Sequence, residues 1–387
     1  MHATRCKNFN QVHLVKGPAE VTLKGSCQVL GKDISNRKVS VSEGKILPFE
    51  IYYGCKIDIN FGKGSKTWAA DYSEAGTRIW RGIIQKVFFE KKVPKLLLII
   101  GESDTGKSTL TTYILNVAIK NGYRSAIVDA DIGQGDLGLP NSIGSAVVTD
   151  QITDLREINA QFFEFIGNTS PLGFEDIIIR AIKNSLKKIS ASYDLCIINT
   201  DGYILSRGLD YKIKMARELQ PDLVVCLGER SYDLFDKFKS RFTSSVVLCG
   251  RSSSETIKSR IERNKRRLNQ LLHYIRAHDK NKIITRELKR TKFVYKGIAY
   301  SRICRDQYGF LKLRKRRGRT SIRVKLSKLV DMFVGLSINE NIIGFGIIVD
   351  VSLTKISIKS NVDNFDKIHL SNSGISKDNT MEFRIIN

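Results

Sequence analysis

Residues 101–108 have the composition and spacing of a phosphate-binding loop. They read Gly-Glu-Ser-Asp-Thr-Gly-Lys-Ser, follow the apolar run Leu96–Ile100 and open a helical pattern near Lys107. The glycines let backbone N–H groups converge on phosphates, the helix start adds a positive dipole, Lys107 reaches the β- and γ-phosphates, and the Ser108 hydroxyl can bind Mg²⁺. The pattern predicts a nucleoside triphosphate site. Its predicted residues are Gly101, Glu102, Ser103, Asp104, Thr105, Gly106, Lys107, Ser108 and Thr109.

Two carboxylates follow the next apolar run. Asp129 and Asp131 lie in the segment Val128-Asp-Ala-Asp-Ile-Gly-Gln-Gly135. In a parallel sheet the carboxyl ends of the strands face the ligand crevice, so a carboxylate there can bind Mg²⁺ or accept a proton from an attacking hydroxyl. Asp131 is the better candidate for both roles and Asp129 the second. Either could instead cap a helix N-terminus.

A third segment whose residues could contact a ligand is Asn199-Thr-Asp-Gly-Tyr203, which ends another apolar run. Gly202 permits a close approach of backbone, and the ring of Tyr203 could stack on a nucleic-acid base. A tyrosine at a strand end is also a common packing residue. The segment therefore predicts substrate contact only together with the other motifs.

The elements that must position these residues are short, continuously apolar runs separated by helical patterns. Strands this apolar are buried on both faces, which predicts a parallel sheet between helices. The sequence therefore predicts an α/β fold with a P-loop NTPase core. The runs are Leu96–Ile100, Ala126–Val128, Leu195–Ile198, Leu223–Leu227 and Val246–Cys249.

Outside this core the continuous apolar runs give way to alternating apolar and polar residues. Residues 18–70 contain short apolar and polar alternations broken by glycines, which predict small antiparallel strands, and a similar pattern returns after about residue 290. An apolar stripe over residues 74–90 predicts a connecting helix. We therefore predict β-rich domains at the two ends. The expected bounds are 1–72 for the N-terminal β-rich domain, 73–290 for the P-loop domain and 291–387 for the C-terminal β-rich domain.

The charge of the chain predicts an acidic partner. Its 387 residues include 64 Lys and Arg against 39 Asp and Glu, a formal net charge of +25. Basic residues gather in Lys258–Lys292 and in Arg302–Lys328, a distribution that favours nucleic acid over a general effect on solubility. No apolar run approaches the ~20 residues of a membrane span. The seven cysteines form no C-x-x-C pair, and the N-terminus lacks a secretory pattern, so we expect a soluble cytoplasmic protein with no membrane partner.

Together these segments resemble the polynucleotide 5′-hydroxyl kinase family, which includes the RNA kinase of the pre-mRNA cleavage machinery, the ribosomal-RNA-processing kinase and archaeal relatives. Four motifs occur in the family's order. They are Gly101–Ser108, Asp129–Gln134 with the following Pro140, Gly167-Asn-Thr-Ser-Pro171, and Asn199–Tyr203. The resemblance implies transfer of the γ-phosphate of ATP to the 5′-hydroxyl end of RNA, with DNA as a further candidate acceptor and RNA-processing proteins as candidate partners.

The family carries an arginine-rich lid over the triphosphate, and residues 252–276 resemble it. Ser252 and Glu255 have the spacing of a capping box. Arg263 and Arg267 are four residues apart, hence on one helical face, and match the lid arginines best. The resemblance implies that they neutralise charge on the transferring phosphoryl group. A solvated basic helix face is the alternative.

The resemblance also implies roles for the remaining motif residues. Asp131 would orient and deprotonate the acceptor hydroxyl, Lys107 would stabilise the developing charge, and Ser108 and Asp131 would hold Mg²⁺. The implied substrate-binding residues are Gln134, Thr169, Thr200, Gly202 and Tyr203.

One position departs from the family pattern. Many members have tryptophan where this chain has Tyr203, which offers a smaller stacking area and could change affinity or base preference. Because Lys107, Ser108 and Asp131 are all present, an active kinase is expected. Two alternatives remain: a non-catalytic ATP-bound scaffold in an RNA-processing complex, and a switch-type P-loop ATPase or GTPase. The absence of an Asn-Lys-x-Asp guanine-reading motif counts against the second.

Overall fold

The computed structural model forms two compact units. The first comprises residues 1–127, 146–159 and 189–257, and the second comprises residues 128–145, 160–188 and 258–387. The structure describes residues 2–5, 12–52, 54–73, 75–89, 92–190, 193–228, 231–240, 245–249, 259–277, 282–305, 310–315, 321–352, 354–375 and 381–383.

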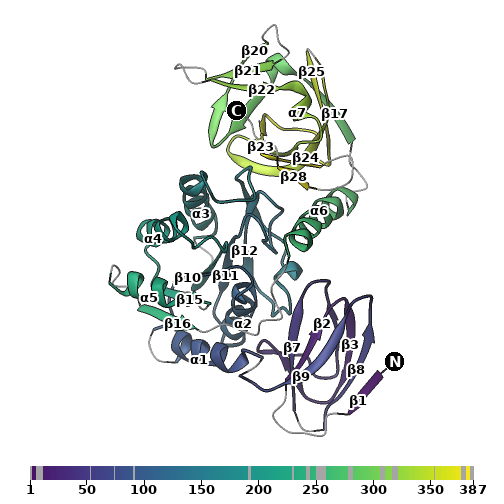
Figure 1. Ribbon diagram of the computed structural model, residues 1–387, viewed down its shortest axis with the longest axis vertical. Coiled ribbons are helices and arrows are strands. Elements are labelled where there is room, and N and C mark those ends of the chain that lie inside the picture. Colours follow the sequence, from purple (N-terminus) through teal and green to yellow (C-terminus); the bar gives the residue numbers. More distant parts are fainter. Residues whose placement is uncertain are drawn as a thin grey trace. The chain divides into compact units, whose positions relative to one another are not determined.

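The core of the fold is a seven-stranded sheet (Figure 1). Its strands are β10 (Leu96–Gly101), β11 (Ser125–Ala130), β12 (Ser142–Val148), β13 (Phe162–Phe165), β14 (Leu195–Thr200), β15 (Leu223–Leu227) and β16 (Ser245–Cys249), in the order β13-β12-β11-β14-β10-β15-β16. β10 pairs in parallel with β14 and β15, and β15 with β16. The predicted parallel sheet is confirmed. β13 is an antiparallel edge strand on β12, and neither strand was predicted.

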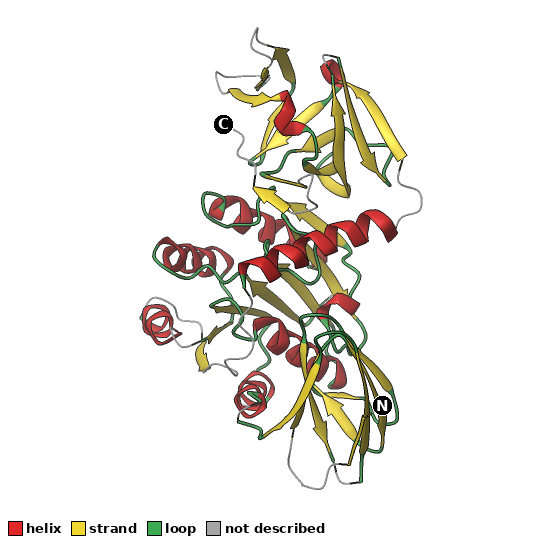
Figure 2. Cartoon of the chain, turned by 45° about the vertical axis from the view of Figure 1, so that its right-hand side comes forward, coloured by secondary structure: helices red, strands yellow, loops and turns green. Residues whose placement is uncertain are grey.

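Among the described residues, six helices of two turns or more accompany the strands, and Figure 2 shows the helices in red. They are α1 (Thr77–Phe88), α2 (Lys107–Lys120), α3 (Glu175–Ile189), α4 (Arg207–Leu219), α5 (Ser231–Lys239) and α6 (Arg260–Ala277). α2 packs against β10 and β14, and α5 against β15 and β16. The helix expected over residues 74–90 is α1, and the predicted lid contains α6. Ser252 and Glu255 lie outside the described residues. No helix in the described part of the chain is both long and apolar enough to cross a membrane.

The N-terminal region is β-rich, as predicted. Its strands are β1 (His2–Arg5), β2 (Val12–Lys16), β3 (Ala19–Lys24), β4 (Cys27–Val29), β5 (Lys32–Asp33), β6 (Lys38–Val41), β7 (Ile46–Ile51), β8 (Lys56–Phe61) and β9 (Lys66–Ala70). They form two antiparallel sheets, β1-β8-β3-β6 and β5-β4-β7-β2-β9. Alternate residues of β3 are buried and exposed, which is the period expected of a strand with one face on a core.

The C-terminal region is β-rich as well. Its strands are β17 (Lys282–Glu287), β18 (Lys292–Tyr295), β19 (Ile298–Tyr300), β20 (Arg302–Arg305), β21 (Phe310–Arg314), β22 (Ser321–Lys325), β23 (Phe333–Ile338), β24 (Asn341–Val351), β25 (Lys355–Ser360), β26 (Lys367–His369), β27 (Ser373–Ile375) and β28 (Met381–Phe383), with the short helix α7 (Leu326–Leu329). The three sheets are β17-β25-β24-β23-β26-β18-β19, β20-β21-β22 and β27-β28. Apolar residues of the first two of these sheets share one core. The exact domain bounds given above stay predictions.

Candidate functional site

The phosphate-binding loop connects β10 to α2. Gly106 caps the start of α2 with a φ of 87°, a left-handed conformation that residues with a Cβ rarely adopt. Within the loop, the Thr105 hydroxyl donates a hydrogen bond of 2.9 Å to the carbonyl of Glu102. α2 begins at Lys107, so the unpaired N–H groups and the positive end of its dipole lie at the loop. This is the arrangement that binds phosphate.

Lys107 is bound to the loop itself. Its side chain is 6% exposed, and its ammonium group donates hydrogen bonds to the carbonyl oxygens of Gly101, at 3.0 Å, and Glu102. A buried ammonium group needs such partners because its transfer from water is costly. Phosphate oxygens are stronger acceptors of the same hydrogen bonds and can replace the carbonyls. The predicted phosphate-binding lysine is therefore already at the loop.

The segment after β14 packs directly on the phosphate loop. A Cβ atom added to Gly202 would lie 2.2 Å from Oγ and 2.5 Å from the backbone nitrogen of Ser103, so only glycine fits. The Thr200 hydroxyl donates to the carbonyl of Ile99 at 2.8 Å, which ties the end of β14 to β10. The predicted substrate residues Thr200, Gly202 and Tyr203 thus lie beside the predicted phosphate site.

Asp201 holds this segment in place. One carboxylate oxygen accepts the backbone N–H of Tyr203 at 2.8 Å. The other accepts the Tyr211 hydroxyl at 3.2 Å and lies 2.9 Å from the ammonium nitrogen of Lys212. Asp201 is 4% exposed and Lys212 is completely buried. Lys212 was not among the predicted site residues. It lies in a buried stripe at helical spacing on α4, and a lysine in such a stripe is a signal that the sequence carries. The other residues of the stripe include Gly208, Tyr211, Met215 and Ala216.

In the second unit, Asp129 organises the turn that follows β11. It is buried, and one carboxylate oxygen accepts the backbone N–H groups of Asp136 at 2.7 Å and Leu137 at 3.0 Å. Burial and the neighbouring charge of Asp136 raise the pKa of Asp129 to about 6. Its contacts are those of a residue that stabilises a loop.

Asp131 caps the same turn. Its Oδ1 accepts the backbone N–H groups of Gly133 at 3.1 Å and Gln134 at 2.8 Å. This is a local capping role of the kind that the sequence left open, although it caps a turn rather than a helix. Asp131 is only partly buried.

Arg267 contacts this turn from α6. Its Nε donates to the carbonyl of Gly133 at 2.8 Å, and its guanidinium also donates to Asn264 at 2.9 Å. Burial lowers the pKa of Arg267, the negative charge of Asp131 opposes that shift, and the positive charge of Arg263 adds to it. The two predicted lid arginines therefore lie within electrostatic range of each other, and Arg267 lies within range of Asp131.

Two further residues of α6 contact the turn, and the sequence analysis did not assign them. Arg266 forms an ion pair with Asp136, whose carboxylate is almost completely buried. Gln270 donates a hydrogen bond of 2.9 Å to the carbonyl of Gly135. Since residues four apart share a helical face, positions 266 and 270 could have been recognised as one polar row facing the turn.

The predicted substrate residues Thr169 and Gln134 also meet at this turn. A Cβ atom added to Gly133 would lie 2.7 Å from the Thr169 carbonyl, so the loop of residues 167–171 packs on the turn. Asn168 fixes that loop by accepting the Thr169 N–H at 3.1 Å. The side-chain oxygen of Gln134 is buried and accepts no hydrogen bond from the part of the chain that the structure describes. A buried oxygen of this kind normally has a hydrogen-bond partner.

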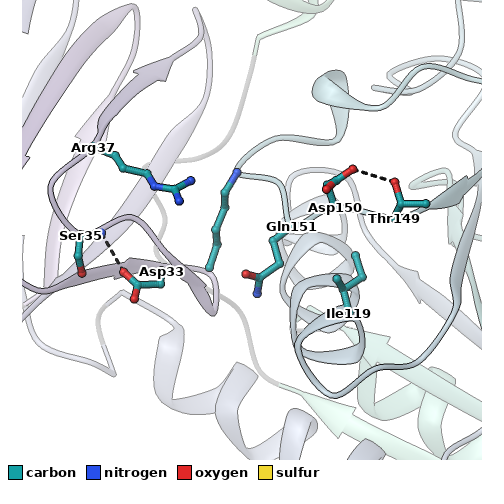
Figure 3. A pocket seen from close by; sticks show the side chains of 8 residues that line it. Asp33, Ser35, Arg37, Ile119, Thr149, Asp150 and Gln151 are labelled. Atoms are coloured by element: carbon teal, nitrogen blue, oxygen red, sulfur yellow. Dashed lines mark hydrogen bonds between the residues drawn. The ribbon is translucent and has the colours of Figure 1, made fainter.

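A separate cavity of about 640 Å³ lies in the first unit (Figure 3). Ile119, near the carboxyl end of α2, lines it, whereas the phosphate loop lies at the other end of that helix. None of the predicted site residues lines this cavity. The lining residues are Lys32, Asp33, Ser35, Arg37, Ile119, Thr149, Asp150 and Gln151.

Several known proteins are similar to this chain. Residues 101–277 match the family described as mRNA cleavage and polyadenylation factor CLP1 P-loop. A polyribonucleotide 5′-hydroxyl-kinase of Pyrococcus abyssi is 35% identical over 142 residues, 36% of this chain and 40% of that protein. A CLP1 homolog of Nematostella vectensis is 26% identical over 298 residues, 70% of this chain and 68% of that protein. The part of this chain that aligns with the Pyrococcus abyssi kinase therefore spans about two fifths of that kinase.

A solved structure shares the whole architecture. Clp1p, in its wild-type complex with Pcf11p, superposes with a TM-score of 0.71 over 95% of this chain and 96% of that chain, at 12% sequence identity. Such a match shows a common fold: a P-loop core between β-rich N- and C-terminal regions. The motif order and the family match agree on the same residues. Residues 101–277 therefore match the CLP1 P-loop family model, in agreement with the predicted resemblance to polynucleotide 5′-hydroxyl kinases.

Proposed function

We propose that this chain is an ATP-dependent polynucleotide 5′-hydroxyl kinase that phosphorylates the 5′ end of RNA. The observation that carries the proposal is the contact between Gly202 and Ser103, because it joins a predicted acceptor-binding segment to a phosphate loop. Phosphoryl transfer depends mainly on positioning donor and acceptor, so adjacent binding segments are what the reaction requires. The archaeal relative named as a polyribonucleotide 5′-hydroxyl-kinase supports the choice of acceptor.

In the proposed reaction the 5′-hydroxyl oxygen forms a bond to the γ-phosphorus, and the bond from that phosphorus to the bridging oxygen of the β-phosphate breaks. ADP leaves, and the proton of the hydroxyl passes to the carboxylate of Asp131. Lys107 exchanges its loop carbonyls for β- and γ-phosphate oxygens, and Arg263 and Arg267 stabilise the charge that develops. Tyr203, Thr200, Thr169 and Gln134 hold the terminal nucleotide.

The residues at the phosphate loop fit a magnesium ion. Mg²⁺ prefers oxygen ligands and usually binds through one or two protein groups together with substrate phosphates and water. The Ser108 hydroxyl, 3.4 Å from the side-chain nitrogen of Asn199, and the Asp131 carboxylate are the proposed protein ligands. No cluster of three or more acidic, His or Cys side chains suited to a metal occurs among the described residues. Bound magnesium would neutralise negative charge on the triphosphate.

The direct test is transfer of label from γ-labelled ATP to a short 5′-hydroxyl RNA in the presence of magnesium. Lys107→Ala and Asp131→Ala should each abolish the label on RNA, and Lys32→Ala, in the separate cavity, should not. A DNA strand of the same sequence tests the second acceptor. If ATP binds but no label reaches RNA or DNA, the chain is instead an ATP-bound scaffold of the type that the sequence left open.

We propose that this chain also binds a protein partner. The solved Clp1p is bound to Pcf11p, which supports a protein partner for this chain. We propose that this partner is an RNA-processing protein. Capture of such a protein by the purified chain, and its retention after nuclease treatment, would separate protein binding from RNA bridging.

A further inference from the structure

The three-stranded sheet β20-β21-β22 has one apolar and one basic face. Leu311, Leu313 and Val324 are buried in the C-terminal core. Because successive side chains of a strand point to opposite faces, Lys312 and Arg323, which alternate with them, lie on the outer face. Arg314 is two residues from Lys312 and Lys325 is two residues from Arg323, so these two side chains lie on the same outer face. Lys312 is partly exposed, and Arg314, Arg323 and Lys325 are exposed.

The register of the sheet places like charges directly opposite each other. Lys312 pairs with Arg323 across β21 and β22, and Phe310 pairs with Lys325. Opposed like charges destabilise a sheet, so this pairing is unfavourable for the chain alone. No Asp or Glu occurs between residues 310 and 330. Among the described residues, no carboxylate forms an ion pair with Lys312, Arg314 or Lys325. A bound polyanion would turn this repulsion into a favourable interaction.

The basic face also carries an aromatic ring. The guanidinium carbon of Arg323 lies 4.7 Å from the centre of the Phe310 ring, and Phe310 is partly exposed. Aromatic rings among cations are typical of surfaces for single-stranded nucleic acid, where bases stack on the rings and cations follow the phosphates. An acidic protein surface would use the cations but would give no role to the ring.

We infer that the outer face of the β20-β21-β22 sheet binds single-stranded RNA. The nucleotides that it contacts are those beyond the reacting 5′ end of the RNA. The cations Lys312, Arg314, Arg323 and Lys325 contact the phosphates, and Phe310 stacks on a base. The contribution of this face to kinase activity rests on the proposed function. The binding of RNA to this face is argued from its charges and its aromatic ring alone. Residues 316–320, which lie outside the described residues, are not part of it.

The test compares two charge-matched variants of the full chain. In the sheet variant Lys312, Arg314 and Lys325 become serine; in the control variant the exposed lysines Lys24, Lys38 and Lys56 of the N-terminal region become serine. Each removes three of the charges that make the net charge +25. Binding of a 20-nucleotide 5′-hydroxyl RNA is measured over a range of salt concentrations. The slope of log affinity against log salt should become shallower by about 2 in the sheet variant, since each lost phosphate contact on a single strand removes about 0.7.

An equal change in both variants would overturn the inference, because it would reflect net charge alone. Thermal unfolding checks that the sheet variant remains folded; removal of repulsion should leave its melting temperature equal or higher. Phe310→Leu should weaken RNA binding about fivefold or more, as expected for loss of base stacking, and should leave binding of inorganic polyphosphate unchanged. Equal loss of both ligands would remove the stacking role.

Kinase assays separate this inference from the proposed function. Phosphorylation of a dinucleotide acceptor should be equal in wild type and sheet variant, whereas kcat/KM for the 20-nucleotide acceptor should fall in the sheet variant. If wild type phosphorylates neither acceptor while the sheet variant still loses RNA binding, the proposed function fails and the binding surface stands. If both acceptors are phosphorylated equally well by all variants and RNA binding is unchanged, the surface fails and the function stands.

Discussion

The ammonium nitrogen of the completely buried Lys212 lies 2.9 Å from the carboxylate of Asp201. Asp201 in turn accepts the N–H of Tyr203, so an ion pair inside the first unit fixes the segment that packs on the phosphate loop. A buried pair of this kind adds little stability compared with apolar residues, but loss of one partner leaves an uncompensated charge. Its contribution is to hold Gly202 and Tyr203 in one conformation.

Lys212→Met should therefore destabilise the chain by about 3–5 kcal/mol, because Asp201 would be left buried without its cation. The double variant Lys212→Met with Asp201→Asn should recover much of that loss. Urea unfolding of the two variants and wild type measures both values. If the single and double variants unfold at the same urea concentration, the two residues are not coupled.

Gly202→Ala tests the contact with the phosphate loop. The new methyl group would collide with Ser103, and displacement of a binding segment by about 1 Å can lower kcat/KM on the order of 100-fold. Adding Ser103→Gly removes the collision with Oγ but not the one with the backbone nitrogen, so we expect only partial rescue. Gly82→Ala is the matched control, since a Cβ atom there meets nothing within 4 Å. Full activity of Gly202→Ala would contradict the close packing.

Tyr203 tests the proposed stacking of the terminal base. Tyr203→Ala should raise the KM for RNA more than it raises the dissociation constant of ATP, because only the RNA contact is removed. Tyr203→Trp should lower the KM for RNA, since the indole ring offers more stacking area. Steady-state kinetics and ATP titrations give the two constants. Equal losses of RNA and ATP affinity in Tyr203→Ala would indicate a general packing role.

Arg267→Ala tests the proposed lid arginine. An arginine that stabilises charge on the transferring phosphoryl group typically contributes on the order of 10³-fold or more to kcat. We expect a loss of that size with a much smaller change in ATP affinity. Arg260→Ala, an exposed arginine on the same helix, should leave both constants close to wild type. A similar loss for both variants would mean that the helix contributes only general positive charge.

Asp129 should make the free energy of unfolding depend on pH. The fold raises the pKa of this carboxyl to about 6 from an ordinary 3.8, through burial and the charge of Asp136. Between those two pH values the folded chain holds a proton that the unfolded chain has released, so the contribution of Asp129 to stability falls as the pH rises from about 4 to about 6.

Asp129→Asn cannot lose that proton but keeps an oxygen for the two N–H groups. Relative to the variant, wild type should therefore be about 2 kcal/mol more stable at pH 4 than at pH 7, at about 1.4 kcal/mol for each pKa unit and with part of the effect already lost at pH 4. Urea unfolding of both proteins at the two pH values measures this difference. The exposed Asp150→Asn is the control. A difference between wild type and Asp129→Asn that does not change with pH would show that the pKa is not raised.

Continuous apolar runs made the buried strands β10, β14 and β15 predictable. β12 was missed because Gly144 and Ser145 interrupt its apolar pattern, although Ser145 is buried. β13 was missed because it is only four residues long and Glu164 interrupts its aromatic residues, so it shows neither a continuous apolar run nor regular alternation.

The motif residues of the candidate site were predictable because phosphate chemistry fixes their spacing. Lys212 and Arg266 were not assigned, since the importance of each depends on a distant carboxylate, Asp201 or Asp136. Only the packing of α4 and α6 decides which carboxylate each one meets. Sequence spacing indicates which face of a helix a residue occupies but not what that face contacts.

The opposed charges of Lys312 and Arg323 have a practical consequence for any stability measurement. A polyanion that relieves their repulsion binds the folded sheet better than the unfolded chain, and so stabilises it by mass action. Nucleic acid carried through purification would raise the apparent melting temperature, and nuclease treatment would lower it. If the proposed surface binds nucleic acid, the measured thermal stability of this protein depends on its content of bound nucleic acid.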